Sequence, residues 1–234
     1  MDRKVFFQYL AENQATLFAD GISSEQKSGL NTKLDVWAKW YAAKHPVNFL
    51  AAALGQIYHE TGGKMVPVLE AFAIDREQSA QLLEKAYNEG RLSWVKQRYW
   101  EKDESGKHPV GGGDIQLTHR RNYVAAQERI GKKFEIDINL AENYDLALDP
   151  VISAHIAFSG MIDGWFRECK LSDFAKDNNT LDYCAARDIV NGDVGLVGKK
   201  IEVYCQTFES ALAAAGAQQD LKPLDENIDW PDHD

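Results

Sequence analysis

A glutamate that follows an apolar run is the first residue of this sequence able to do chemistry. Glu60 stands in the motif HETGG at 59–63, directly after a segment that contains AAAL at 51–54. A carboxyl that leaves a buried helix for a cleft loses hydration, which disfavours its charged form and suits a general acid near neutral pH. The alternative is a solvated carboxylate at a helix end. A zinc protease is excluded, because Gly63 stands where its second histidine is needed.

A second carboxylate follows ten residues later, at Glu70. The glycines at 62–63 let the chain turn back, and Pro67 stiffens the return. This path can place Glu70 across a groove from Glu60. Hydrolysis of a glycosidic bond needs such a pair, because one carboxyl protonates the leaving oxygen while the other activates water or attacks the sugar. The alternative for Glu70 is an ordinary surface carboxylate before a helix.

A glycine-rich segment, GGGDIQLT at 111–118, is the third candidate. Three glycines allow an approach to the backbone that side chains would block. No Gly-Lys-Ser/Thr follows them, so the segment is not a phosphate loop. Alternation with Ile115 and Leu117 predicts that Gln116 and Thr118 share one side of an extended segment, where they can hold a sugar hydroxyl or a water. The alternative is a surface turn.

Two weaker signals lie elsewhere in the chain. Asn191 opens NGD at 191–193, which is first a turn signal and can also present an amide to an N-acetyl group. Tyr99 and Trp100 precede a loop at 101–114 that is rich in charge and glycine, and loops of this length are often functional. This aromatic pair forms either a cleft wall or part of the core.

The elements that must position these residues are helices. Apolar residues recur at steps of three and four, and helix-start and helix-stop residues delimit the runs. Alternating β-branched stretches are scarce. The sequence therefore predicts a mainly α fold with at most one short β-hairpin in the loop region. The expected helices cover 4–18, 24–41, 46–62, 77–89, 120–131, 150–168, 182–190 and 197–215.

Composition bounds the function. The chain has 234 residues and a net charge of −10, which argues against a general nucleic-acid binder and against docking on anionic lipid. Its three cysteines are odd in number and form no CxxC pair, so we expect reduced thiols. No apolar run is long enough to span a membrane, and the first residues lack the features of a secretory signal. We expect one domain over 1–217 and an acidic tail, 218–234, that is frayed or loosely docked.

Taken together, the motifs resemble glycoside hydrolase family 19 and its phage and prophage endolysin relatives, which have a lysozyme-like helical fold. The matching segments occur in the order of the family and span roughly 45–210. They are HETGG at 59–63, PVLEAF at 67–72, YW at 99–100, GxGDIQLTHxRNY at 111–123, NLAENYDLALDP at 139–150 and IVNGD at 189–193. The resemblance implies a domain of two lobes with a central cleft.

The resemblance also implies roles. Glu60 matches the general acid of the family, Glu70 the second carboxylate of the endolysin branch, and Thr118 the residue that positions the attacking water. The expected substrate contacts are His59, Gln116, Asn122, Tyr123, Asn191 and Trp100. The family inverts the anomeric centre by single displacement, for which the two carboxyls should lie ~6.5–9.5 Å apart.

One position departs from the family pattern. Gly112 stands where the family usually has an arginine that braces the acid site, and glycine cannot replace a charged fork. Arg120 and Arg121 are the candidates for compensation, and nothing in the sequence shows that either one compensates. Without compensation, catalysis would be weakened, or the protein would only bind glycan.

The resulting expectation is a monomeric endolysin that cleaves β-1,4 bonds between amino sugars of peptidoglycan, with no metal and no cofactor. It would be made in the cytoplasm without a signal peptide and would reach the cell wall after a holin opens the membrane. Two alternatives stay open. One is a chitinase, since chitin also presents N-acetylglucosamine, and the other is a non-catalytic glycan-binding protein on the same fold.

Overall fold

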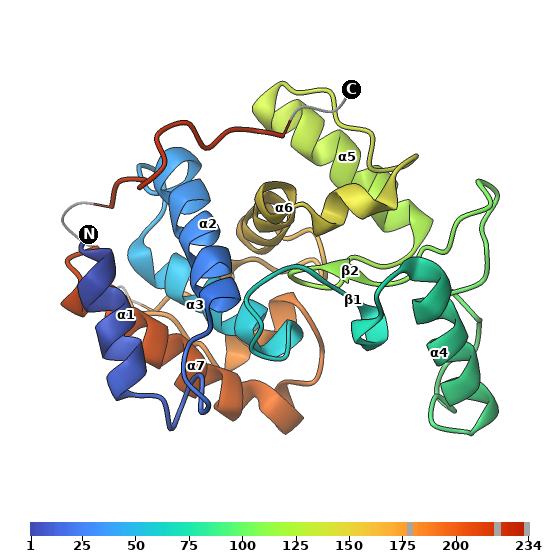
Figure 1. The fold of residues 1–234 in the computed structure, drawn as a ribbon, viewed down its shortest axis with the longest axis horizontal. Helices are drawn as coiled ribbons and strands as arrows, with labels where there is room; N and C mark the ends of the chain where they lie inside the picture. The colour runs from blue at the N-terminus through green and yellow to red at the C-terminus, as the bar shows by residue number, and fades with distance from the viewer. Residues whose placement is uncertain (177–179, 218–220, 232–234) are drawn as a thin grey trace.

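The computed structural model describes residues 1–176, 180–217 and 221–231, and it is mainly helical (Figure 1). This confirms the predicted fold class. The α-helices are α1 (Arg3–Glu12), α2 (Ser24–Trp40), α3 (Val47–Glu60), α4 (Arg76–Asn88), α5 (Arg120–Phe134), α6 (Pro150–Asp163) and α7 (Val194–Ala214). Short 3-10 helices are η1 (Glu70–Phe72), η2 (Tyr144–Leu148), η3 (Leu171–Phe174) and η4 (Ala185–Ile189), and the strands are β1 (Val68–Leu69) and β2 (Gly112–Gly113).

Local sequence explains where several helices begin and end. Ser23 and Gln26 form a reciprocal capping box at the start of α2, and the Asp149 side chain caps α6 ahead of Pro150. The predicted helix at 150–168 stops earlier because Gly164 takes a left-handed conformation. Two other predictions were too long. The helix expected at 4–18 ends at Glu12, and the one expected at 182–190 is only the short η4.

The central helix α3 is almost entirely buried, and it packs mainly along α7 and also against α6. Gly55 makes the close approach to α7 possible, because a Cβ there would stand 2.4 Å from the Cys205 sulfur. α1 covers α7, while α2 covers α6. This packing fixes the direction of α3, and therefore the point at which Glu60 leaves the core.

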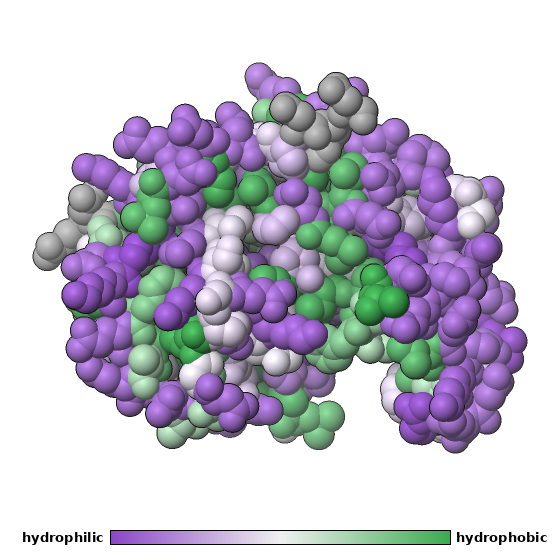
Figure 2. Space-filling view, viewed as in Figure 1, coloured by the Kyte–Doolittle hydropathy of each residue, from purple (hydrophilic) through white to green (hydrophobic). Residues whose placement is uncertain are grey.

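The hydrophobic residues form two clusters, one for each lobe. The larger cluster lies among α1, α2, α3, α6 and α7. The smaller cluster lies beneath α4 and consists of Leu69, Ala80, Leu83, Trp100 and Val110. The α4 side projects from the body, and the surface is hollowed between the two (Figures 1 and 2). This arrangement confirms the expected two-lobed helical domain with a cleft.

A two-stranded antiparallel sheet links the lobes. Val68 pairs with Gly113 and Leu69 with Gly112. The strands are therefore not neighbours in sequence, as a hairpin inside the loop region would require. The pairing joins the segment that carries Glu70 to the glycine-rich segment at 111–118.

The described part of the C-terminal tail is docked against the body. Trp230 stacks on the His155 ring at 4.0 Å, and the Leu224 amide donates to Asp35 at 2.8 Å. Residues 221–231 therefore contact the body, and an aromatic side chain near their end has a buried partner, His155. The rest of the predicted tail, 218–220 and 232–234, lies outside the described residues. The described residues contain no helix long and apolar enough to cross a membrane, and all three cysteines are unpaired.

Candidate active site

The end of α3 delivers Glu60 to the surface. The Thr61 hydroxyl donates to the Ile57 carbonyl at 2.7 Å and accepts from the Met65 amide, so the chain reverses directly after the helix. Gly62 and Gly63 take φ values of 58° and 82°, which an L side chain rarely adopts. The HETGG motif therefore does two things: it ends a buried helix on a carboxylate, and it supplies the turn that leads toward Glu70.

Glu60 is braced by an arginine from η4. Arg187 Nη1 donates to Glu60 Oε1 at 2.5 Å, and the two side chains are 2% and 16% exposed. Asp193 holds the other side of the guanidinium, with Nε to Oδ1 at 2.6 Å, and Gln56 accepts a further bond at 3.0 Å. Burial opposes the charged form, but the bonds to Asp193 and Glu60 outweigh it and raise the pKa of Arg187. Among the described residues, no hydrogen-bond donor reaches Glu60 Oε2.

His59 lies beside this ion-pair network. Burial, followed by the positive charge of Arg187, lowers the pKa of His59, so its imidazole is neutral at pH 7. A neutral ring carries one N–H donor and one acceptor, the pair of functions that a sugar hydroxyl needs. The half-buried position of His59 is compatible with the predicted substrate contact.

Glu70 sits on a strained turn. Ala71 and Phe72, which follow it in η1, have φ values of 60° and 53°. The Phe72 ring lies 2.9 Å from where a Cβ on Gly62 would stand, so the turns after Glu60 and Glu70 pack on each other. Strained backbone in non-glycine residues is concentrated at functional sites. Here it is stabilised by the β1–β2 pairing and by the bond from the Ser79 hydroxyl to the Glu70 carbonyl.

Both carboxylate oxygens of Glu70 have donors. The Tyr99 hydroxyl donates to Oε1 at 2.5 Å, and the Gly111 amide donates to Oε2 at 2.9 Å. Burial and the charge of Glu70 raise the pKa of Tyr99, so its hydroxyl remains a donor. Two donors fix the plane of the carboxylate while its remaining lone pairs stay available.

Three acceptor oxygens converge at the glycine-rich segment. A Cβ on Gly111 would stand 3.1 Å from Glu70 Oε2, 2.9 Å from Gln116 Oε1 and 3.1 Å from Thr118 Oγ1. The Thr118 hydroxyl donates to the Gln116 carbonyl at 2.8 Å, which leaves its oxygen free to accept. The structure thus brings together Glu70, Gln116 and Thr118 as predicted, although Gln116 reaches the site through a left-handed φ of 55° and not through an extended strand. A water between these oxygens would be held by its two hydrogens.

A buried ion pair supports the glycine-rich segment from behind. Lys33 of α2 approaches Asp114 at 2.9 Å, and neither side chain is exposed. Lys33 also donates to the Met65 carbonyl at 2.9 Å. One ammonium group therefore ties the turn after Glu60 to the segment after Gly111. Removing one member of such a pair leaves an uncompensated buried charge, so the link is rigid.

Comparison with known proteins bears on this architecture. A solved structure of chitinase C from Streptomyces griseus HUT6037 matches with a TM-score of 0.51 at 18% identity, covering 94% of this chain and 78% of that chain. This chain has the chitinase C fold. A mutant of chitinase C covers the same shares at 16% identity, with a TM-score of 0.47. No protein-family model matches the sequence, and no curated protein matches it.

Within the chitinase C fold, the remaining predicted contacts separate into two groups. Asn122 and Asn191 are exposed; Asn122 donates to the Thr118 carbonyl at 2.7 Å, and Asn191 lies 3.4 Å from Asp193. Tyr123 and Trp100 are 0% and 2% exposed. Their placement does not fit direct contact with glycan, because each ring is enclosed and each polar atom has a partner inside the protein.

The enclosed aromatic residues act as supports. The Tyr123 hydroxyl donates to the Val110 carbonyl at 2.9 Å, next to Gly111. The Trp100 indole donates to Glu84 at 2.9 Å, and its ring packs edge-on against Tyr99 at 5.1 Å. The neighbouring ring, Tyr99, is the one that reaches Glu70. The YW motif therefore contributes through its first residue and not its second.

One arginine other than the two candidates lies beside Gly112. Arg76 of α4 lies over it, with Nη2 3.1 Å from where a Cβ would stand. The same guanidinium donates to the Val110 and Tyr144 carbonyls, so the space beside Gly112 is filled by a cation from another element. Arg76 contacts neither Glu60 nor Glu70 in the described structure; the arginine that pairs with Glu60 is Arg187.

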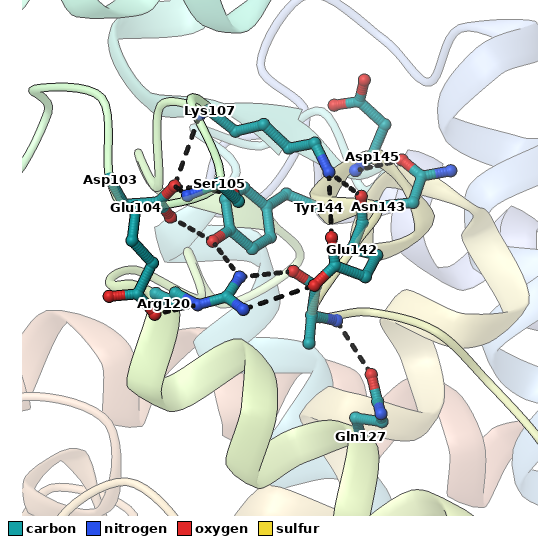
Figure 3. Close-up of polar contacts among 11 residues, drawn as sticks. Asp103, Glu104, Ser105, Lys107, Arg120, Gln127, Glu142, Asn143, Tyr144 and Asp145 are labelled. Atoms are coloured by element: carbon teal, nitrogen blue, oxygen red, sulfur yellow. Dashed lines mark hydrogen bonds and ion pairs between the residues drawn. The ribbon is translucent and has the colours of Figure 1, made fainter.

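Arg120, one of the two expected substitutes, has a different task (Figure 3). It bonds to Glu104 at 2.9 Å and to Glu142 at 3.3 Å, and it donates to Tyr144 at 3.2 Å. Lys107 and Asp103 add further contacts to this network. The network anchors the long loop at 101–110 to η2 and α5. Arg120 therefore does not brace Glu60, because its guanidinium is already paired with the carboxylates of Glu104 and Glu142.

Sequence reasoning missed two side chains of this site, Arg187 and Tyr99. Arg187 stands in AARDI at 185–189, between apolar residues and six positions before Asp193. A charge within an apolar stretch beside a late acidic residue was the available signal. Tyr99 was recognised only as part of an aromatic pair. Among the described residues, no group of three or more His, Cys, Asp or Glu side chains is placed to hold a metal ion.

Proposed function

We propose that this protein is a glycoside hydrolase that cleaves β-1,4 bonds between amino sugars by single displacement. One observation carries the proposal. Two carboxylates stand in adjoining turns with different partners, Glu60 on a buried arginine and Glu70 on two neutral donors beside the acceptors of Gln116 and Thr118. Paired carboxyls in unlike environments are the requirement for acid and base roles in glycoside hydrolysis.

In the proposed reaction, Glu60 is the general acid that gives a proton to the leaving glycosidic oxygen. A water held by Glu70 and Thr118 attacks the anomeric carbon from the opposite face, and Glu70 takes the proton that the water loses. The carbon–oxygen bond to the leaving sugar breaks as the new one forms, so the anomeric configuration inverts. Gln116, Asn122 and Asn191 hold the sugar, and Arg187 orients the acid.

We propose peptidoglycan as the substrate and an endolysin as the biological role, acting on the wall after a holin opens the membrane. The ordered motifs from HETGG to IVNGD support this. Chitin is the second candidate, and the likeness to chitinase C favours it. A protein that only binds glycan is the third. The ion pair between Arg187 and Glu60 favours the enzyme over the binding protein, because Glu60 has an arginine partner although Gly112 stands at the position of the family arginine.

A reducing-end assay on purified peptidoglycan and on chitin oligomers tests the proposal. Wild type is compared with Glu60→Gln, which keeps the shape and removes the acid, and with Glu12→Gln, an exposed control on α1. We expect new reducing ends from wild type and the control, and a loss of about 10²-fold or more in Glu60→Gln. Unchanged glycan in all three samples, beside a lysozyme that digests it, would reject the hydrolase.

A further inference from the structure

Two arginines on one face of α5 are not explained by the proposed catalytic apparatus. Arg121 and Arg129 are both exposed, and Ala125 stands midway between them. Residues four apart on a helix lie on the same side, so the three form a row along α5. Eight residues of helix rise about 12 Å. The row therefore places two cations at separate points along one surface.

These two guanidinium groups have no acidic partner in the described part of the chain. Within 1–176, 180–217 and 221–231, every other arginine forms an ion pair with a carboxylate, and Arg121 and Arg129 do not. The paired arginines are Arg3, Arg76, Arg91, Arg98, Arg120, Arg167 and Arg187. The chain has 36 acidic residues and a net charge of −10, so two arginines without acidic partners on one face of a helix contrast with the rest of its charge distribution.

Arg129 lines a pocket next to the candidate catalytic residues. The pocket has a volume of about 240 Å³, and Thr118, Gln116 and Asn122 form one side of it. Arg129 is the single charged side chain among the described residues that line it. Its guanidinium lies 5.6 Å from the Trp165 ring centre and donates to the Trp165 carbonyl at 3.3 Å. The cation is thus held at the pocket while most of its donors stay free.

Arg121 lies in the first turn of α5. It neighbours His119, whose ring packs edge-on against Tyr99 at 5.2 Å, and Tyr99 donates to Glu70. After burial, the charge of Arg121 is the next cause that lowers the pKa of His119. The row on α5 therefore begins two residues after His119 and ends at the pocket, which Ala125 and Arg129 line.

We propose that Arg121 and Arg129 form a binding site for the carboxylates of an acidic glycan strand. The proposal rests on the proposed function, which it narrows. A polymer of N-acetylglucosamine is neutral, whereas peptidoglycan carries a carboxylate on each muramic acid or on the peptide attached to it. Arginine forks match carboxylates in shape and charge. Because the rest of the protein repels anions, local cations beside the cleft are what such a strand requires.

Binding to insoluble glycan tests the site without any need for turnover. The parent is Glu60→Gln, so that no glycan is consumed. Sedimentation is measured with peptidoglycan, with peptidoglycan whose carboxylates are methyl-esterified, and with chitin. Arg121→Gln/Arg129→Gln is compared with Lys4→Gln/Lys44→Gln, which changes net charge equally at exposed positions elsewhere. Arg121→Lys/Arg129→Lys keeps the charge and tests for rescue, and circular dichroism confirms that each variant is folded.

We expect the arginine double variant to bind peptidoglycan at least about tenfold more weakly than the parent, with chitin binding changed less than threefold. Esterification should weaken the parent to a similar degree and should leave the arginine variant unaffected. The lysine control should match the parent, and the Arg-to-Lys variant should recover part of the loss. Equal binding of peptidoglycan by parent and arginine variant would overturn the site, as would a parent that binds neither glycan.

The outcomes separate this inference from the hydrolase proposal. If wild type releases no reducing ends while the Glu60→Gln parent binds peptidoglycan through its arginines, the carboxylate-binding site is supported and the hydrolase proposal is rejected. If wild type cleaves peptidoglycan and the arginine variant binds it as tightly as the parent, the hydrolase stands and the carboxylate site falls.

Discussion

Arg187 Nη1 lies 2.5 Å from Glu60 Oε1, and Asp193 clamps the opposite edge of the same guanidinium at 2.6 Å. The general-acid candidate is therefore held by a residue from η4, far along the chain, and not by the glycine-rich segment where the family pattern places an arginine. An acid oriented by a fixed fork presents its second oxygen in one direction, which is what proton transfer to a leaving group needs.

Substitutions of Arg187 should distinguish the effect of its positive charge from the effect of its hydrogen-bond geometry. Arg187→Lys keeps a positive charge but cannot bond Glu60, Asp193 and Gln56 together, so we expect kcat on peptidoglycan to fall about 10–100-fold. Arg187→Met leaves a partly buried carboxylate unpaired and should lower the free energy of unfolding by about 3 kcal/mol. Steady-state kinetics and urea unfolding measure the two effects. Arg167→Lys, in an exposed ion pair with Asp188, is the control and should change neither.

The hydroxyl of Tyr99 should matter more than its ring. Tyr99→Phe removes the donor at 2.5 Å from Glu70 Oε1 and keeps the packing. A hydrogen bond to a charged group contributes about 1.5–3 kcal/mol, so kcat should drop roughly 10–100-fold with little change in KM. Tyr87→Phe, in the same apolar cluster, is the matched control. Equal kcat values for the two variants would show that the Tyr99 hydroxyl does not orient Glu70.

A side chain at Gly111 should fill the space between the three acceptor oxygens. The φ of Gly111 is not among the positive values, so alanine can adopt the backbone conformation, but the new Cβ would stand 2.9–3.1 Å from the oxygens of Gln116, Glu70 and Thr118. We expect Gly111→Ala to fold with a Tm close to that of wild type and to lose about 10²-fold in kcat, because the methyl group displaces the attacking water. Gly195→Ala is the control, because a Cβ there meets nothing within 4 Å. Gly90→Ala is unsuitable, because the φ of Gly90 is +77°. A Gly111→Ala enzyme as active as Gly195→Ala would place the water elsewhere.

His119 should show a trade-off between stability and activity. Its backbone has φ 69° and ψ 135°, a conformation that favours glycine, and its ring packs against Tyr99. Relief of strain of about 1–3 kcal/mol exceeds or offsets the entropic cost of glycine, about 0.5–1 kcal/mol. We therefore expect His119→Gly to keep or raise Tm while kcat falls severalfold. Thermal unfolding and kinetics on one preparation give both numbers, and a lower Tm with full activity would contradict the prediction.

Stability should decrease in mild acid because of His155. Burial lowers the pKa of His155 to about 3, and the charge of Lys133 acts in the same direction. As pH falls below about 6.5, the unfolded chain takes up a proton that the folded chain refuses until pH 3. The contribution of the neutral ring is thus complete above pH 6.5 and is lost between 6.5 and 3, at up to about 1.4 kcal/mol per pH unit. Urea unfolding at pH 7.0, 6.0 and 5.0 should show this slope.

The variant His155→Phe isolates that contribution. Phenylalanine keeps the stacking with Trp230 at 4.0 Å and carries no titratable group. Its free energy of unfolding should vary less with pH between 7.0 and 5.0 than that of wild type. Parallel pH slopes for the two proteins would assign the acid sensitivity to other groups.

Much of the fold could be predicted from sequence because its signals are local. The apolar spacing of α2 and α3, the capping residues Ser23 and Asp149, and the glycines at 62–63 each act within a few positions of the chain. Helix existence followed from these patterns. Helix length did not always follow, as at Glu12, because tertiary packing decides where a marginal turn stops.

The sequence by itself determined which side chains could do chemistry: a carboxylate at the end of a buried helix, a second one after a turn, and an amide and a hydroxyl in a glycine-rich segment. Only the tertiary structure decided what surrounds them. Arg187 and Tyr99 reach Glu60 and Glu70 from distant segments, and Trp230 covers His155 from the tail. Contacts of this kind form because packed helices bring residues that are far apart in the sequence close together in space, and no local sequence pattern contains that information.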